Sequence, residues 1–293
     1  MLRVVVTGAS GLIGQSLVAA LRSRGDDVLT VGRASGDVRW DPCSGPLPQQ
    51  AFADRDAVVH LAGESVAQRW SANAREAIEQ SRTTGTANLV AGLRASGAAR
   101  PAILVSASAV GYYGDRGEEP LTEGSAPGSD WLAQVCVGWE RSAAAAQELE
   151  IRVCSLRTGV VLAKSGGALK RMLPPFRLGI GGPVAGGQQY MPWIALEDVV
   201  GMYTAALDSE RWSGPVNASA PQPATNAEFS AALGHALHRP ALTPVPAFAM
   251  RALYGSMAQI VLGGQRALPE RALELGYEFR FSALEPALAA TLS

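Results

Sequence analysis

Three glycines near the start of the chain have a spacing that can bind phosphate groups. Gly8, Gly11 and Gly14 lie in the run Thr7-Gly-Ala-Ser-Gly-Leu-Ile-Gly14, directly after the apolar residues 2–6. A strand, a tight turn and a helix together offer backbone N–H donors and the positive end of the helix dipole to a pyrophosphate. In this context the spacing predicts a dinucleotide-binding turn, and the alternative is an ordinary strand-to-helix turn.

Each glycine of the turn has a separate expected role. Gly8 permits the sharp turn, Gly11 lets the backbone approach the phosphates, and Gly14 lets the helix pack close to the strand. The side chains between them are expected to border the same cofactor. We therefore assign the turn of the cofactor site to Gly8, Ser10, Gly11, Leu12, Ile13 and Gly14.

Arg33 bears on which dinucleotide is bound. Sites that prefer NAD place an acidic residue about 20 residues after the turn, where it bonds the ribose 2′-hydroxyl. Here the apolar residues 28–31 are followed by Gly32 and Arg33, with no acid at the end of the expected strand. Because a guanidinium pairs well with phosphate oxygens, the sequence predicts NADP(H) as the cofactor. The alternative interpretation of Arg33 is a solvated surface arginine.

Alternating strands and helices must hold this turn in place. The expected strands are residues 2–6, 28–31, 57–62, 102–106 and 151–156. Helical patterns separate them, among them a long helix expected over residues 131–149, as is typical of parallel βαβ units. The third strand ends in Leu61, Ala62 and Gly63, whose small residues suit the close approach of a cofactor. The sequence therefore predicts an α/β fold, a Rossmann-type doubly wound parallel sheet with a small C-terminal substrate lobe.

The residue composition of the chain changes after residue 157. The stretch 164–192 is rich in glycine and proline and carries Lys164, Lys170, Arg171 and Arg177. Such a loop-rich insert suits a phosphate or carboxylate substrate, and a solvated loop is the alternative. We expect residues 1–160, completed by 192–220, to form the nucleotide-binding domain. Residues 161–191 and 221–293 are expected to form the substrate-binding lobe.

Composition and charge exclude several classes of partner. The net charge of −1 argues against nucleic acid, and no apolar stretch reaches the roughly 20 residues that a membrane span needs. The three cysteines are far apart and no signal-peptide pattern is present, so we expect a cytoplasmic protein. The expected partner is a small molecule with anionic character. We expect no membrane partner, no metal, and a monomer or homodimer.

Two further runs carry a resemblance to a known family. They are Ser106-Ala-Ser-Ala-Val-Gly-Tyr-Tyr-Gly114 and Pro192-Trp-Ile-Ala-Leu-Glu-Asp198. With the glycine turn, they resemble the extended short-chain dehydrogenase/reductase superfamily, which includes the nucleotide-sugar epimerases. Residues 179–193 and the C-terminal helices resemble an atypical branch of uncharacterised activity. The likeness covers nearly the whole chain, and Ala107 and Val160 are assigned with the turn to the cofactor site.

The resemblance also exposes a departure from the usual chemistry. That superfamily uses a serine, together with a tyrosine four residues before a lysine on one helix face. The serine matches Ser108, but Leu132 stands at the tyrosine position and Cys136 at the lysine position. Leucine has no proton to give, and a thiol is mostly neutral at pH 7. We therefore expect the normal proton relay to be absent.

The candidate catalytic residues are then Ser108, Tyr113 and Cys136. Tyr113 follows Ser108 closely and is a candidate proton donor, although packing against the cofactor is the alternative role. Cys136 could serve only if a nearby charge lowers its pKa. Arg82 could supply that charge, because the resemblance places it where an asparagine usually helps to hold a relay water.

Arg82 itself is assigned to the cofactor site. An arginine there could bind the nicotinamide ribose, a phosphate or an anionic substrate, and the alternative is a structural salt bridge. Two functions therefore stay open. One is an NADP(H)-dependent oxidoreductase or epimerase-like enzyme with a non-standard proton donor, which the retained Ser108 and the substrate lobe favour. The other is a non-catalytic NADP(H)-binding or sensor protein, which the missing tyrosine and lysine favour.

Overall fold

A central parallel sheet organises the molecule. The structure, a computed structural model, describes residues 1–293. Seven strands hydrogen-bond in the order β11-β7-β5-β4-β1-β2-β3, and every pair is parallel. They are β1 Arg3–Thr7, β2 Asp27–Gly32, β3 Val38–Arg39, β4 Ala57–His60, β5 Ile103–Ala109, β7 Arg152–Thr158 and β11 Gly214–Ala218. The predicted α/β fold with a doubly wound parallel sheet is confirmed.

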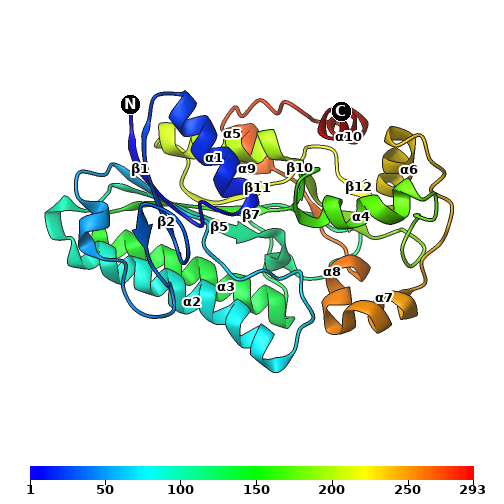
Figure 1. Ribbon diagram of the computed structural model, residues 1–293, viewed down its shortest axis with the longest axis horizontal. Coiled ribbons are helices and arrows are strands. Elements are labelled where there is room, and N and C mark those ends of the chain that lie inside the picture. Colours follow the sequence, from blue (N-terminus) through cyan, green and yellow to red (C-terminus); the bar gives the residue numbers. More distant parts are fainter.

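Helices cover both faces of this sheet (Figure 1). Helices α1 (Leu12–Ser23) and α5 (Leu196–Asp208) lie on one face, and α2 (Ala72–Ala95) and α3 (Trp131–Ala144) lie on the other. Successive residues of a strand point to opposite faces. Accordingly Val4 and Val6 pack with the side chains of α1 and α5, whereas Val5 packs with those of α2. The apolar runs therefore form strands buried on both faces.

The helix starts differ in a way that matters for the site. Ser71 caps α2 by accepting from Ala74 N, and Asp130 caps α3 by accepting from Leu132 N. Helix α1 begins after Gly11, and no side chain caps it. The first N–H groups of α1 therefore remain available to a ligand.

A second group of elements packs against one end of the sheet and builds its own core. Its helices are α4 Gly167–Arg177, α6 Asn226–Ala236, α7 Ala247–Tyr254, α8 Gln259–Leu262, α9 Glu270–Glu274 and α10 Leu284–Leu292. Its short strands pair as β8 Val160–Leu162 with β10 Trp193–Ala195, β9 Tyr190–Met191 with β12 Ala224–Thr225, and β6 Pro120–Leu121 with β13 Arg266–Ala267. Leu169, Trp193, Phe229 and Leu288 are among the buried residues of this core.

Two segments differ from the sequence-based expectation. The stretch expected to be loop-rich contains α4, an 11-residue helix with Pro174 and Pro175 inside it. Leu169, Leu173 and Phe176 fall on one face of α4 and are buried, so packing outweighs the helix-breaking tendency of the prolines. The helix expected over residues 131–149 ends at Ala144 and continues as a 3₁₀ helix, Ala145–Leu149.

No helix of the chain combines the length and the apolar character needed to cross a membrane.

Candidate functional site

The glycine turn is built by backbone geometry that other residues cannot adopt. Gly8 has φ +68°, and its N–H donates to Val31 O at 3.1 Å. A Cβ on Gly8 would lie 2.6 Å from the carbonyl carbon of Leu61, and one on Gly14 would overlap the carbonyl oxygen of Gly8. The turn therefore packs so closely against the end of β4 and the start of α1 that only glycine fits at both positions.

Gly11 faces open space instead. It stands just before α1, and the only atom within 4 Å of a Cβ added there would be the carbonyl oxygen of Gly8, at 3.3 Å. Ser10 and Gly11 are exposed, and Leu12 and Ile13 are half-buried. Together with the uncapped N–H groups of α1, this gap forms an open cradle that can bind a phosphate group.

A buried hydrogen-bond chain supports the turn from below. Thr7 Oγ1 lies 2.7 Å from His60 Nδ1, and His60 Nε2 lies 3.1 Å from Thr86 Oγ1. Burial lowers the pKa of His60 to about 4, so its ring is neutral near pH 7. The chain links the ends of β1 and β4 to α2, and we assign His60 a structural role.

The remaining predicted cofactor residues lie at the same edge of the sheet. Leu61, Ala62 and Gly63 follow β4, Ala107 lies near the end of β5, and Val160 follows β7. Because the carboxyl ends of parallel strands meet at one edge, the fold brings these segments to the side on which the glycine turn lies.

Arg33 lies at the tip of β2, beside Gly32. Its side chain is 68% exposed, and its Nη2 lies 3.4 Å from Glu64 Oε2. An exposed ion pair of this kind contributes little free energy, so the guanidinium is available to an incoming anion. This position is compatible with the predicted binding of a 2′-phosphate by Arg33. A bound phosphate would compete with Glu64 for the guanidinium.

Arg82 has no carboxylate partner. Its Nη1 donates to the carbonyl oxygens of Glu64 at 2.9 Å and Ile78 at 3.1 Å, and its guanidinium lies 4.9 Å from the ring centroid of Trp139. The guanidinium carbon is 3.5 Å from where a Cβ of Gly63 would lie. The alternative of a structural salt bridge is therefore wrong for this structure, and the cation stands beside the end of the third predicted strand.

Ser108 points into the protein interior. It is 3% exposed, and its hydroxyl donates to Glu140 Oε1 at 2.6 Å. Glu140 also accepts from Arg157 Nε and Nη2, each at 2.8 Å. The hydroxyl proton of Ser108 is thus held by a buried ion pair, which argues against a bond from Ser108 to a substrate oxygen.

Tyr113 is also engaged inside the fold. It is fully buried, donates to Asn217 Oδ1 at 2.7 Å and accepts from Arg157 Nη1 at 2.9 Å. Burial raises the pKa of Tyr113 to about 12, although Arg157 acts in the opposite direction. These contacts argue against Tyr113 as the proton donor, because its buried hydroxyl is already bonded to Asn217 and Arg157.

Cys136 is a buried, neutral thiol. It is 2% exposed, and burial raises its pKa to about 12 even though the charge of Arg82 lowers it. The desolvation of a thiolate therefore outweighs the nearby cation, and the condition under which Cys136 could donate or accept a proton is not met. Across from it lies the backbone of Gly111, where a Cβ would be 3.8 Å from Cys136 Sγ and 3.3 Å from Leu132 Cδ2.

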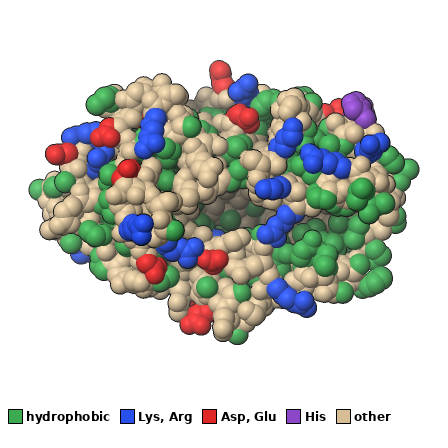
Figure 2. Space-filling view, viewed as in Figure 1, with side chains coloured by type: hydrophobic (Ala, Val, Ile, Leu, Met, Phe, Trp, Pro, Cys, Tyr) green, Lys and Arg blue, Asp and Glu red, His purple; other side chains and the backbone are tan.

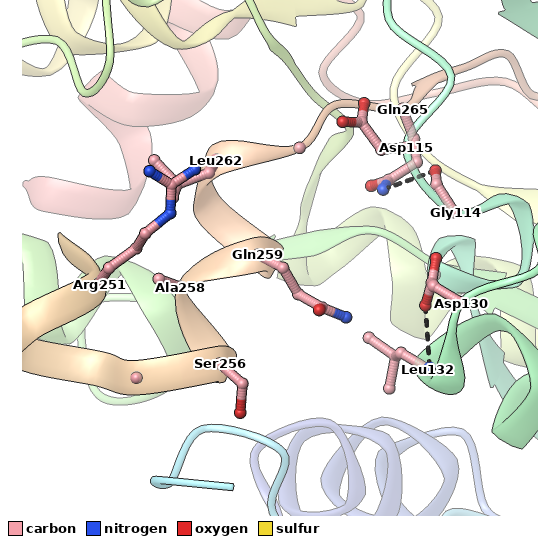
Figure 3. A pocket seen from close by; sticks show the side chains of 13 residues that line it. Gly114, Asp115, Asp130, Leu132, Arg251, Ser256, Ala258, Gln259, Leu262 and Gln265 are labelled. Atoms are coloured by element: carbon pink, nitrogen blue, oxygen red, sulfur yellow. Dashed lines mark hydrogen bonds between the residues drawn. The ribbon is translucent and has the colours of Figure 1, made fainter. Parts of the chain in front are cut away.

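A cavity of about 570 Å³ lies beside Gly111 and Leu132 (Figure 3). Gly111, Asp130 and Leu132 line one side of it, and Arg251 and Gln259 line the other. Leu132, at the tyrosine position of the resemblance, therefore contributes an apolar side chain to the cavity lining and has no proton to supply.

The sequence analysis missed the side of the cavity that comes from the C-terminal segment. One signal was available, since Arg251 is the only charged residue between residues 240 and 265. A lone cation in an apolar, glycine-containing segment suggests a binding role. Gln265, whose Nε2 donates to Gly114 O at 2.9 Å, ties this segment to the opposite wall (Figure 3).

Comparisons with known proteins agree over nearly the whole chain. Residues 4–218 match the model of the NAD dependent epimerase/dehydratase family, and residues 245–291 match a domain of unknown function, DUF1731. Epimerase family protein Mb2239 of Mycobacterium bovis is 42% identical over 97% of this chain and 96% of its own length. Epimerase family protein YfhF of Bacillus subtilis is 33% identical over 98% of this chain and 97% of its own.

A solved structure is similar as well. The crystal structure of human epimerase family protein SDR39U1 (isoform 2) with NADPH superimposes with a TM-score of 0.89 and 35% identity, covering 99% of this chain and 98% of that one.

Proposed function

The chain belongs to the NAD dependent epimerase/dehydratase family, and from this premise we propose that it is an NADP(H)-dependent oxidoreductase or epimerase-like enzyme. The resemblance to the atypical branch of the short-chain dehydrogenase/reductases is confirmed by the same comparisons. In the proposed enzyme the glycine turn binds NADP(H), and a small anionic molecule binds in the cavity beside Gly111 and Leu132. One observation carries the proposal, namely a ligand-sized cavity lined by both parts of the molecule.

The residues of the turn fit a dinucleotide. The space that a Cβ of Gly11 would enter is open, while Gly8 and Gly14 hold the turn closed behind it. In our proposal the N–H groups of α1 bind the pyrophosphate, and Arg33 binds the 2′-phosphate. Arg82 orients the nicotinamide-side ribose in place of the absent lysine. When bound, the nicotinamide supplies or accepts a hydride.

The charges at the cavity favour an anionic ligand. Asp130 caps α3, and Asp115 accepts from Gly264 N at 3.0 Å, so both carboxylates that line the cavity already have partners. Arg251 has no salt bridge and is exposed. We therefore propose that Arg251 binds a carboxylate or phosphate of the substrate.

One observation favours the second function, a protein that binds NADP(H) without catalysing a reaction. Ser108, Tyr113 and Cys136 are all less than 4% exposed, and two of them are committed to internal hydrogen bonds. A protein that holds NADP(H) without turnover would have no need of a proton relay. The proton of the enzymatic reaction would have to come from solvent or from the substrate.

The test is NADPH oxidation measured against a panel of small carbonyl compounds and standard nucleotide sugars. We expect turnover of an anionic carbonyl compound and negligible turnover of the sugars. Arg251→Ala should raise KM for that compound about ten-fold or more, while the matched exposed variant Arg211→Ala should not. Cys136→Ala and Tyr113→Phe should leave kcat within about two-fold, on the burial argument above.

The outcomes separate the two functions. NADPH binding without turnover of any compound would favour the non-catalytic function. Robust turnover of a nucleotide sugar would contradict the expected absence of the proton relay. Failure of the wild type to bind NADPH would overturn both.

A further inference from the structure

Two segments of the C-terminal part combine cations with apolar side chains and contain no acid. Residues 170–180 and 239–253 contain five Lys or Arg residues and no Asp or Glu, although the whole chain has a net charge of −1. The five are Lys170, Arg171, Arg177, Arg239 and Arg251. We call the surface of these two segments the cationic-apolar face.

The two segments touch each other. The ring of Pro240 lies 3.6 Å from where a Cβ of Gly179 would be, and Thr243 N donates to Gly181 O at 3.4 Å. Just beyond, Ala185 N donates to Val245 O at 2.9 Å. Arg177, at the end of α4, therefore lies close to Arg239 and the residues that lead into α7. Figure 2 shows blue and green side chains together over this part of the molecule, with little red.

Large apolar side chains project from this face. The whole molecule has eight exposed large hydrophobic residues, and five of them are here. Their exposed fractions are Leu178 75%, Ile180 58%, Leu242 84%, Phe248 74% and Leu253 65%. Helix α7, which carries Phe248 and Leu253, contains no buried residue. Such a concentration on one face marks an interaction site, since scattered exposed residues would need no explanation.

A second copy of the chain is a poor occupant. A twofold interface places the same patch against itself, so cations of one copy would face cations of the other, and neither segment contains an acid to pair with them. The partner must instead be anionic and must accept protruding apolar groups. A bilayer containing anionic lipids has both properties, with negative headgroups above an apolar interior.

We propose that the cationic-apolar face docks on an anionic lipid surface. Arg177 and Arg239 contact the headgroups, and Phe248 and Leu253 enter the boundary between headgroups and acyl chains. Arg251, which also lines the cavity, then stands near the lipid. This replaces the sequence-based expectation of no membrane partner. The face could not be seen in the sequence, because two segments far apart in the chain build it and no single basic amphipathic helix does.

The experiment is co-sedimentation of the full chain with lipid vesicles. We expect binding to vesicles of phosphatidylcholine with phosphatidylglycerol, decreasing with added salt, and little binding to phosphatidylcholine alone. Arg177→Glu/Arg239→Glu should weaken partitioning about ten-fold or more, since each cation near such a surface contributes about five-fold. Phe248→Ser/Leu253→Ser should weaken partitioning by a similar factor, since two large apolar side chains no longer enter the bilayer. Matched controls are Arg141→Glu/Arg211→Glu and Leu273→Ser, exposed residues elsewhere.

The result can contradict the proposal in three ways. Absence of binding to the anionic vesicles overturns it, and binding of poly-L-glutamate in that case points to an acidic protein as the partner. Equal binding to both kinds of vesicle overturns the role of the cations. An equal loss in the control variants overturns the assignment to this face. Circular dichroism and NADPH titration of each variant show that the fold is retained, so a misfolded variant is not mistaken for a loss of docking.

Discussion

The glycine turn and the region around Ser108 show how differently two parts of one site depend on the rest of the fold. In the turn, Gly8, Gly11 and Gly14 act through their backbone, and the atoms packed closest to them are backbone atoms, those of the turn itself and, for Gly8, those of Leu61 and Ala62. Around Ser108, the direction of each side chain depends on residues far away in the sequence. Glu140, which holds the Ser108 hydroxyl, is 32 residues distant, and Asn217, which holds Tyr113, is 104 residues distant.

This difference explains why the glycine turn keeps the family's motif, whereas the region around Ser108 has lost the tyrosine and the lysine. Local backbone requirements can be met only by particular residues at particular spacings, so the turn tolerates little change. A side chain that only looks catalytic can instead serve the packing of its neighbours. Ser108, in an apparently retained motif, is used to complete the buried Arg157–Glu140 ion pair.

The most severe expected effect is at the turn. Gly11→Val should weaken NADPH binding roughly a hundred-fold or more, because the side chain would occupy the space of the pyrophosphate and displace bonds worth about 1.5–3 kcal/mol each. The fold should persist, since only one atom lies within 4 Å of the added Cβ. NADPH fluorescence titration and circular dichroism measure the two effects.

The matched control is Gly124→Val, an exposed glycine with no atom nearer than 4.0 Å. It should bind NADPH like the wild type. If a folded Gly11→Val protein bound NADPH with wild-type affinity, the assignment of the pyrophosphate site to the glycine turn would be wrong.

The second test concerns Ser108. Ser108→Ala should lower the free energy of unfolding by about 1–3 kcal/mol, because Glu140 loses a buried hydrogen bond to a charged group. NADPH affinity should stay within about two-fold, since the Ser108 hydroxyl bonds to Glu140 and not to the turn, Arg33 or Arg82. Urea unfolding and NADPH titration provide the measurements.

Ser106→Ala is the comparison variant, because Ser106 is buried but bonds only a neutral carbonyl, Ala107 O at 3.1 Å. Unchanged stability of Ser108→Ala together with lost turnover would return Ser108 to a substrate role.

The smallest expected effect is at Arg33. Arg33→Ala should weaken NADPH binding about three- to ten-fold, a modest change because the guanidinium is exposed and shared with Glu64. NADH binding should not change, because NADH has no 2′-phosphate. Titration of both cofactors against wild type, Arg33→Ala and the nearby exposed variant Arg39→Ala gives the comparison. Equal wild-type affinities for NADPH and NADH would rule out the role of Arg33.

The fold was predictable because its signals are local and repeated. Each buried strand of the parallel sheet reads as an apolar run, and the predicted strand at residues 2–6 differs from β1 by one position. Helix α4 was not predicted, because Pro174 and Pro175 argue against a helix until the burial of Leu169, Leu173 and Phe176 is known.

The site was predictable only in part, for the same reason. The turn and Arg33 follow from spacing along one segment. The environment of Cys136 does not, because its burial depends on how α3 packs against α2 and the η3 turn, Val110–Tyr113. Likewise, the single charge of Arg251 within residues 240–265 suggests a binding role, but the segment does not indicate that Arg251 and Gln259 face Gly111 across a cavity.

The bonds of Asn217 bear on how the chain folds. Besides accepting from Tyr113, Asn217 donates from Nδ2 to Leu121 O at 3.3 Å and to Leu268 O at 2.8 Å. Its strand, β11, completes the central sheet, while Leu268 belongs to the C-terminal segment. A chain cut near residue 220 would keep the bonds of Asn217 to Tyr113 and Leu121, but it would lose the shortest bond from Nδ2, the one to Leu268 O. The boundary between the predicted nucleotide domain and the substrate lobe is thus crossed by a buried hydrogen bond, and we expect the nucleotide domain alone to be less stable than it is within the whole chain.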